Sequence, residues 1–283
     1  MRSSSHNGGR GRGAHRSQAD IGQRGPGRGR GTLRVVGLGP GSPEHLSPRA
    51  KETLEGAEVI VGYKGYIQLI EPGLLKGKEV VSTGMTKEIE RCKGAIEKAL
   101  EGRSTAIVSS GDAGIYGMAG LIMDLLIEQG LVDDLDVEMV PGIPALTAAA
   151  SLLGAPLMHD FAVISLSDLL TPWKIIERRA KAALEADFVL VIYNPSSRKR
   201  DWQLGRIMDL VREWRGDDAP VGIVRNAMRD GQEVVVGPAS EADLSRVDML
   251  SIVFVGNSQT RLVAGKMVTP RGYLSKYGSD KEP

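Results

Sequence analysis

The sequence is poor in residues that several classes of protein require. It has a single cysteine, Cys92, which excludes an internal disulfide and any metal site built from several cysteines. Aromatic residues make up only 4% of the chain, too few for a surface that binds nucleic acid by stacking its bases. No apolar run reaches about 18 residues and no apolar signal segment begins the chain, so neither a transmembrane helix nor a signal peptide is expected. Together these absences predict a cytoplasmic protein in a reducing environment.

The first 31 residues differ in composition from the rest of the chain. Residues 1–31 contain nine glycines, seven arginines and one acidic residue, a net charge of +6, which leaves −5 on the remainder of a chain whose total is +1. Such a segment cannot bury enough apolar surface to offset the entropy of ordering it, so we expect a disordered tail. A weak RNA- or phosphate-binding arm and an extension without function are both compatible with this composition.

Beyond the tail, short apolar runs alternate with helical segments, a pattern typical of βαβ units and a mostly parallel sheet. It predicts an α/β fold of two domains, residues 32–154 with a mostly parallel sheet and residues 155–283 with a mixed sheet, and an active site in the cleft between them. The Asp230-Gly231 turn predicts a hairpin in the second domain. Strands are expected at 33–37, 59–61, 79–81, 105–109, 137–140, 161–166, 188–193, 221–224, 233–236 and 251–255. Helices are expected at 48–56 (capped by Ser47), from a Thr86 cap to 100, at 115–128, in an alanine-rich segment ending at 154, at 172–185 (capped by Thr171) and at 201–214.

Five of the predicted strands end in turns rich in glycine, proline or asparagine. Glycine tolerates positive φ and lets another group approach the backbone closely. Ligands of open α/β sheets bind beyond the carboxyl ends of the strands. These turns therefore predict one small-molecule groove between two sheets. They are Gly37–Gly41, Ser110–Gly114, Pro141–Ala145, Tyr193–Pro195 and Arg225–Ala227.

Several familiar motifs are absent at these turns. The first turn is not a dinucleotide fingerprint, because Ser42 stands where the third glycine belongs and Pro40 lacks a backbone N–H, which disfavours a nicotinamide-dependent oxidoreductase. No serine lies in a G-x-S-x-G elbow, so a hydrolase is poorly supported. The four histidines show no ligand spacing, and no metal site is predicted. Asp112 follows a strand directly, as a ligand-binding carboxylate or as the N-cap of the next helix.

Taken in order, three of these turns resemble a known family. The pattern G-x-G-P-G at 37–41, G-D-x-x-x-Y at 111–116 and P-G-[IV] at 141–143 is similar to that of the tetrapyrrole methylases, which use S-adenosylmethionine (SAM), and the resemblance covers about residues 33–265. Segments 154–161, 164–173, 193–195 and 255–257 resemble the branch that methylates carbon 17 of precorrin-3B, or its cobalt form, with ring contraction to precorrin-4 in cobalamin (vitamin B12) synthesis. The alternatives left open are another corrin-ring or uroporphyrinogen methyltransferase and an rRNA methylase-like RNA-binding protein, which the charge of −5 disfavours.

The resemblance also implies site residues and partners. SAM is expected between the domains, bound largely through main-chain groups, and ring contraction requires proton transfer. The substrate is a tetrapyrrole carrying many carboxylates, which arginines bind well; a homodimer is implied, with no membrane contact. The expected cofactor-binding residues are Gly39, Pro40, Ser110, Gly111, Asp112, Ile115, Pro144, Ala145, Asn194 and Ala227. The expected proton-transfer residues are Asp112, His159 and Asp168, and the expected substrate-binding residues are Arg198, Arg200 and Arg225.

Overall fold

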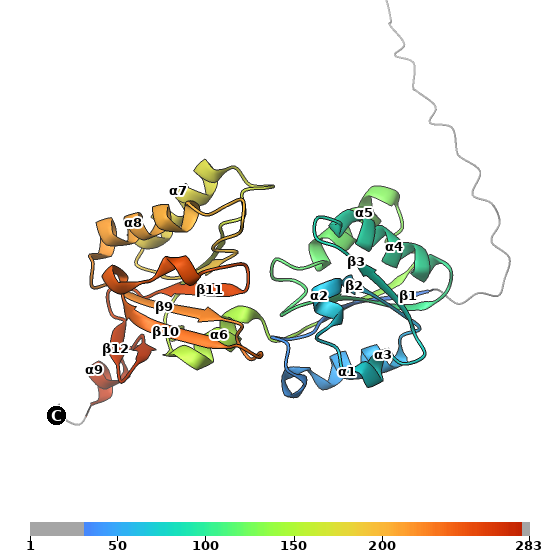
Figure 1. Cartoon of the computed structure of the whole chain (residues 1–283), viewed down its shortest axis with the longest axis horizontal. Coiled ribbons are helices and arrows are strands. Elements are labelled where there is room, and N and C mark those ends of the chain that lie inside the picture. The colour runs from blue at the N-terminus through green and yellow to red at the C-terminus, as the bar shows by residue number, and fades with distance from the viewer. Residues whose placement is uncertain (1–30, 279–283) are drawn as a thin grey trace, which may run out of the picture.

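The computed structural model describes residues 31–278 as two α/β bodies joined by extended chain, each built around a five-stranded sheet (Figure 1). The prediction of a disordered arginine- and glycine-rich tail falls on residues 1–30, outside the described part. The α/β fold with a parallel and then a mixed sheet is confirmed. Within residues 31–278, no helix combines the length and apolar character needed to cross a membrane.

The first sheet is entirely parallel, in the order β3-β2-β4-β1-β5. Parallel strands are buried on both faces, and here alternate residues of each strand supply two separate cores. Val35 and Ile107 pack under α4 and α5, whereas Val36 and Val108 pack over α1 and α3. The strands are β1 (Thr32–Gly37), β2 (Val59–Tyr63), β3 (Glu79–Thr83), β4 (Ser104–Ser109) and β5 (Asp136–Val140). The helices are α1 (Pro48–Gly56), α2 (Lys64–Ile67), α3 (Pro72–Leu75), α4 (Glu88–Leu100) and α5 (Ala119–Gln129).

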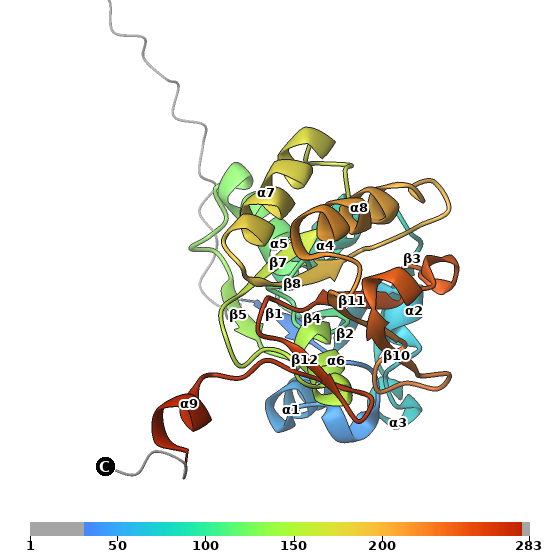
Figure 2. The same ribbon diagram turned by 90° about the vertical axis from the view of Figure 1, so that its left-hand side faces the viewer.

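The second sheet is mixed, in the order β10-β9-β11-β8-β7, with β7 and β8 parallel and the other neighbours antiparallel. Helices α7 and α8 cover one face and α6 covers the other (Figure 2). The strands are β7 (Phe161–Ser165), β8 (Val189–Tyr193), β9 (Pro220–Arg225), β10 (Glu233–Pro238) and β11 (Ser251–Val255). The helices are α6 (Ala145–Leu153), α7 (Trp173–Glu185) and α8 (Gln203–Arg215). The hairpin predicted from Asp230-Gly231 is present as β9 and β10.

The packing of α6 bears on the division between the two bodies. The sequence places the division after this helix, at 154/155. In the structure, Leu146 and Leu153 of α6 pack against the second sheet, beside Val224 and Phe254. We therefore propose that the first unit ends before α6.

Some local predictions were wrong. The side chain of Thr86 does not cap α4; its hydroxyl donates to the Met85 carbonyl, and Lys87 is the N-cap residue. The next helix begins at Ala119 instead of Ile115, because Tyr116 has a positive φ of 54° that no α-helix accommodates. The small sheet of β6 (Gly154–Ala155), β12 (Arg261–Val263) and β13 (Lys266–Val268) and the short helix α9 (Tyr273–Tyr277) were not predicted.

Three turns at the carboxyl ends of β1, β4 and β5 meet backbone to backbone. Gly39 and Gly111 exchange two main-chain hydrogen bonds of 3.0 and 2.7 Å, and both have positive φ. A Cβ on Gly37 would lie 2.7 Å from the Gly111 oxygen, and one on Gly142 would lie 2.3 Å from the same atom. We call Gly37–Gly41, Ser110–Gly114 and Pro141–Pro144 the strand-end turns. Glycine at their contact points is what allows all three to meet.

We predict that Gly142→Ala destabilises the fold by about 1–3 kcal/mol, because its new Cβ overlaps main-chain atoms that cannot move aside independently. Chemical denaturation measures the change. Gly94→Ala is the matched control: Gly94 lies inside α4 with no atom within 4 Å of the added Cβ, so alanine there should stabilise by up to about 1 kcal/mol. Equal stabilities for the two variants would contradict the close approach of the turns.

A second prediction concerns Cys92, which is fully buried between α4 and the first sheet. Burial raises the pKa of its thiol to about 11, so little thiolate forms at neutral pH and none is accessible. The native protein should therefore not react with a thiol reagent such as dithionitrobenzoate, and the unfolded chain should release one thiol equivalent. Rapid modification of the native protein would contradict the placement of α4.

Candidate active site

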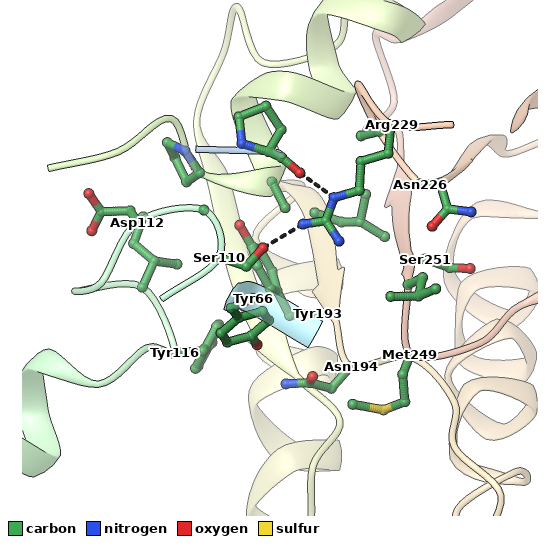
Figure 3. A pocket seen from close by; sticks show the side chains of 18 residues that line it. Tyr66, Ser110, Asp112, Tyr116, Tyr193, Asn194, Asn226, Arg229, Met249 and Ser251 are labelled. Carbon is green, nitrogen blue, oxygen red and sulfur yellow. Dashed lines mark hydrogen bonds between the residues drawn. The ribbon is translucent and has the colours of Figure 1, made fainter. Parts of the chain in front are cut away.

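A pocket of about 190 Å³ lies between the two sheets, where the carboxyl ends of their strands face each other (Figure 3). The first sheet contributes the strand-end turns, and the second contributes the turns after β8 and β9 and the segment leading into β11. Nine of the ten predicted cofactor-binding residues line this pocket, drawn from five separate segments of the chain. They are Pro40, Ser110, Gly111, Asp112, Ile115, Pro144, Ala145, Asn194 and Ala227. Gly39 does not line it, but its paired hydrogen bonds hold Gly111 in the wall.

Asp112 holds two of the strand-end turns together. One carboxylate oxygen accepts a hydrogen bond from the Gly114 N–H at 2.8 Å, and the other accepts from the Gly142 N–H at 3.0 Å. Helix α5 begins seven residues later, at Ala119, so Asp112 is not its N-cap. The carboxylate is turned away from the pocket (Figure 3), and its two hydrogen bonds hold the wall in position.

Two tyrosines connect the halves of the pocket. The Tyr116 ring, which follows β4, lies 5.2 Å from the Tyr193 ring at the end of β8, and its hydroxyl donates to the Val163 carbonyl in β7 at 3.3 Å. The hydroxyl of Tyr193 accepts a hydrogen bond from the Leu146 N–H at 2.9 Å. Burial raises the pKa of Tyr193 to about 12, so this phenol stays neutral at physiological pH. The tyrosines therefore shape the pocket and do not supply a base.

Three residues that line the pocket have a strained backbone. Tyr116, Asn194 and Asn226 have φ of 54°, 49° and 51°, in the left-handed region that side chains other than glycine enter at a cost. The surroundings hold Asn194 in place: its side-chain amide donates to Ser165 Oγ at 2.9 Å, and its carbonyl accepts from Arg200. Strain that persists through such contacts is typical of functional sites.

The structure does not place the three predicted substrate-binding arginines in the pocket. Arg198 is exposed in the turn after β8, and Arg200 is buried, with its guanidinium donating to the Asn194 carbonyl. Arg225 forms an ion pair of 3.0 Å with Asp248 and a second one of 3.6 Å with Glu233. Arg200 and Arg225 thus support the pocket wall instead of offering free donors to a substrate.

The predicted proton-transfer residues His159 and Asp168 lie at opposite ends of strand β7 in the second sheet. Asp168 follows the carboxyl end of β7, next to the carboxyl end of β8, which carries Tyr193. Its carboxylate accepts a hydrogen bond from the Gln203 amide at 2.9 Å. His159 precedes β7, and a five-residue strand spans about 15 Å. Its ring accepts a hydrogen bond from the adjacent Asp160 N–H. His159 is therefore remote from the pocket, and the hypothesis that it acts there has no support from its position.

Sequence reasoning missed Arg229, which reaches the pocket from the loop between β9 and β10. Its Nε donates to the Pro40 carbonyl, and a terminal nitrogen donates to Ser110 Oγ at 2.6 Å, so it joins the second body to two strand-end turns of the first (Figure 3). Tyr66 of α2 and residues 249–252 also line the pocket unpredicted. Arg229 stands two residues beyond the predicted Arg225-Asn226-Ala227 turn, but directly before the Asp230-Gly231 turn it looked like an ordinary hairpin residue.

The donor set indicates which ligands the pocket fits. Within residues 31–278, no three histidine, cysteine, aspartate or glutamate side chains are close enough together to hold a metal ion. The walls offer main-chain groups at Gly111, Ala145 and Ala227, three tyrosine rings and one guanidinium. Glycine and alanine there leave the backbone open to a nucleoside, so the lining is compatible with SAM and its exposed carboxylate.

Comparison with known proteins agrees with this geometry. The chain is 51% identical over 241 residues to the probable cobalt-factor III C(17)-methyltransferase of Salmonella typhimurium, covering 85% of this chain and 99% of that one. It is 47% identical to the cobalt-factor III methyltransferase of Priestia megaterium, of which it spans 46% of the length, and 38% identical to the precorrin-3B C(17)-methyltransferase of a Sinorhizobium species, of which it covers 97%.

Among solved structures, the methyltransferase CobJ superposes with a TM-score of 0.81 at 36% identity, covering 85% of this chain and all of the other. Residues 32–243 match the family of tetrapyrrole (corrin/porphyrin) methylases. The match covers the first sheet, every strand-end turn and four of the five strands of the second sheet, all but β11. The resemblance inferred from three glycine-rich motifs is confirmed. The chain belongs to the tetrapyrrole methylase family.

Proposed function

We propose that this protein is a SAM-dependent C-methyltransferase of cobalamin synthesis, which methylates carbon 17 of cobalt-factor III or precorrin-3B and contracts the ring. The observation that carries the proposal is the convergence of nine expected cofactor-binding residues on one pocket. The names of the Salmonella and Sinorhizobium relatives agree on carbon 17 and differ on cobalt. A tetrapyrrole substrate and a homodimer belong to the same proposal, as implications of the family resemblance.

The chemistry asks little of acid or base groups in the first step. SAM supplies a methyl group on a sulfonium, whose leaving group needs no protonation. The protein's task is to align a nucleophilic ring carbon with the methyl–sulfur bond and to exclude water, and such positioning supplies on the order of 7–11 kcal/mol of a barrier. The strand-end turns suit this task, because their close backbone contacts fix the directions of their main-chain groups.

Ring contraction does require proton transfer, and the three candidate residues differ in position and contacts. Both carboxylate oxygens of Asp112 accept hydrogen bonds from main-chain N–H groups. His159 lies at the amino end of β7, away from the pocket. Asp168 does not line the pocket, but it follows the carboxyl end of β7, beside the end of β8 where Tyr193 and Asn194 line it, and its carboxylate lies 3.9 Å from Arg200 Nε. We propose Asp168 for this role over the other two.

The proposed function predicts a specific binding preference. Calorimetry should show binding of S-adenosylhomocysteine in the nanomolar-to-micromolar range and no binding of NADH, whose pyrophosphate finds no glycine fingerprint here. With SAM and a cobalt-factor III or precorrin-3B substrate, mass spectrometry should show the addition of one methyl group. Methylation of a different corrin precursor in the same panel would move the assignment to another carbon, and binding of NADH alone would overturn it.

We further predict that Asp112→Ala weakens S-adenosylhomocysteine binding about tenfold or more, because it releases the Gly114 and Gly142 N–H groups and loosens two strand-end turns. Asp112→Asn keeps one acceptor oxygen and should lose less affinity. Asp160→Ala is the control. The Asp160 carboxylate is exposed at the amino end of β7, away from the pocket, so this variant should bind as the wild type does. Unchanged affinity in Asp112→Ala would show that Asp112 does not position the wall.

A further inference from the structure

Arg229 differs from the other arginines near the pocket in what it contacts. Its guanidinium bonds to two uncharged acceptors, the Pro40 carbonyl and the Ser110 hydroxyl. Among residues 31–278, no carboxylate lies within ion-pair distance of it, whereas Arg225, at the start of the same loop, has two carboxylate partners. Asp230 is adjacent in the sequence and Asp112 lies in the same pocket, yet neither pairs with it.

An unpaired guanidinium is costly in this position. Arg229 is largely buried, and burial lowers the pKa of its guanidinium. A buried charge is normally paired, because neutral acceptors recover only part of its lost hydration. Arginine also has five N–H donors in a planar fork that matches a carboxylate with two parallel bonds. Arg229 therefore has the properties of a group whose anionic partner is a ligand.

The place of Arg229 indicates what kind of ligand can reach it. Arg229 and Asn226 line both the pocket and a neighbouring groove of about 830 Å³, which is bounded by Gly41–Glu44 and Gln68–Pro72 of the first body. The guanidinium thus borders both the pocket and the larger groove. A ligand in either space can present a carboxylate to it.

The loop that carries Arg229 is held rigidly. Asn226 and Met228 both have left-handed φ, and the Met228 N–H donates to Gln232 Oε1 at 2.9 Å. The Asn226 carbonyl accepts from the Arg229 N–H at 3.0 Å, and its amide donates to the Gly231 carbonyl at 3.3 Å. These bonds direct the side chain across the gap before any ligand arrives, which is the preorganisation expected of a binding residue.

We propose that Arg229 is the carboxylate-binding residue of this site, and that a ligand carboxylate takes the guanidinium donors now given to Pro40 and Ser110. The inference rests on the proposed function, which supplies two sources of that carboxylate. One is the α-carboxylate of the methyl donor, from the pocket. The other is an acid side chain of the tetrapyrrole, from the groove. Binding would then also change the contact by which Arg229 joins the two bodies.

The test compares Arg229→Gln, Arg229→Met and Arg229→Lys with the wild-type protein. Glutamine keeps donors without charge, methionine removes both, and lysine keeps the charge without the fork. Arg212→Gln, on α8 and paired with Asp209 and Asp217, is the control and should match the wild type. Thermal unfolding of each variant identifies loss of fold. Calorimetry uses S-adenosylhomocysteine and its carboxyl methyl ester, and kinetics at saturating SAM give KM and kcat for the tetrapyrrole.

If the carboxylate belongs to the methyl donor, Arg229→Gln and Arg229→Met should bind S-adenosylhomocysteine about tenfold or more weakly, while affinity for the methyl ester changes little. If it belongs to the tetrapyrrole, cofactor affinity should hold and KM should rise by a similar factor with kcat nearly constant. Lysine should restore part of either loss.

Two results would overturn the inference while leaving the proposed function intact. One is a set of folded variants with unchanged affinity and KM. The other is equal loss for acid and ester with no change in KM, since a purely structural contact does not distinguish them. A wild-type protein that neither binds S-adenosylhomocysteine nor transfers a methyl group would overturn the proposed function itself.

Discussion

The structure of the site depends on the backbone contact between the turns after β1, β4 and β5. Gly39 and Gly111 bond to each other through their main chains, and Gly37 and Gly142 pack so closely that a methyl group at either position would overlap a neighbour. A wall built this way has few movable parts, so its carbonyl and N–H groups keep fixed directions. That property suits a reaction in which alignment, more than acid–base chemistry, lowers the barrier.

The second body completes the pocket with side chains where the first supplies backbone. Tyr193 and Asn194 end β8, Asn226 follows β9, and contacts from Tyr116 to Val163 and from Arg229 to Ser110 cross between the bodies. The crossing contacts are few, and besides hydrogen bonds they include the Tyr116–Tyr193 ring contact and the packing of Ile115 against the core beside α6. The geometry of the gap is therefore easier to change by ligand binding than the geometry of either wall, whose cores are apolar and continuous.

The sequence predicts much of this architecture because buried strands and capped helices have local signals. Ser47 caps α1 as expected, its side chain accepting from the Ala50 N–H, and every strand of the two large sheets was anticipated. The strands β6, β12 and β13 were missed because each has only two or three residues and is stabilised by partners far along the chain. His159 precedes β7 and so lies at the amino end of that strand, away from the carboxyl ends that border the pocket. Its expected role came from the family resemblance and not from its position.

The arginines show where sequence reasoning stops. Arg198, Arg200, Arg225 and Arg229 all follow strands of the second body, and nothing in their neighbours along the chain ranks them. What separates them is the distance to acidic residues brought in by the fold: Asp248 and Glu233 neutralise Arg225, and Asp168 lies near Arg200, while Arg229 is directed toward a carbonyl and a hydroxyl of the other body. Of Arg200, Arg225 and Arg229, only Arg229 has no carboxylate within ion-pair distance among the described residues, and it lines both cavities. The Arg229 guanidinium is left without an anionic partner where the pocket and the groove meet. A carboxylate on the ligand best explains this arrangement, because a buried charge is normally paired.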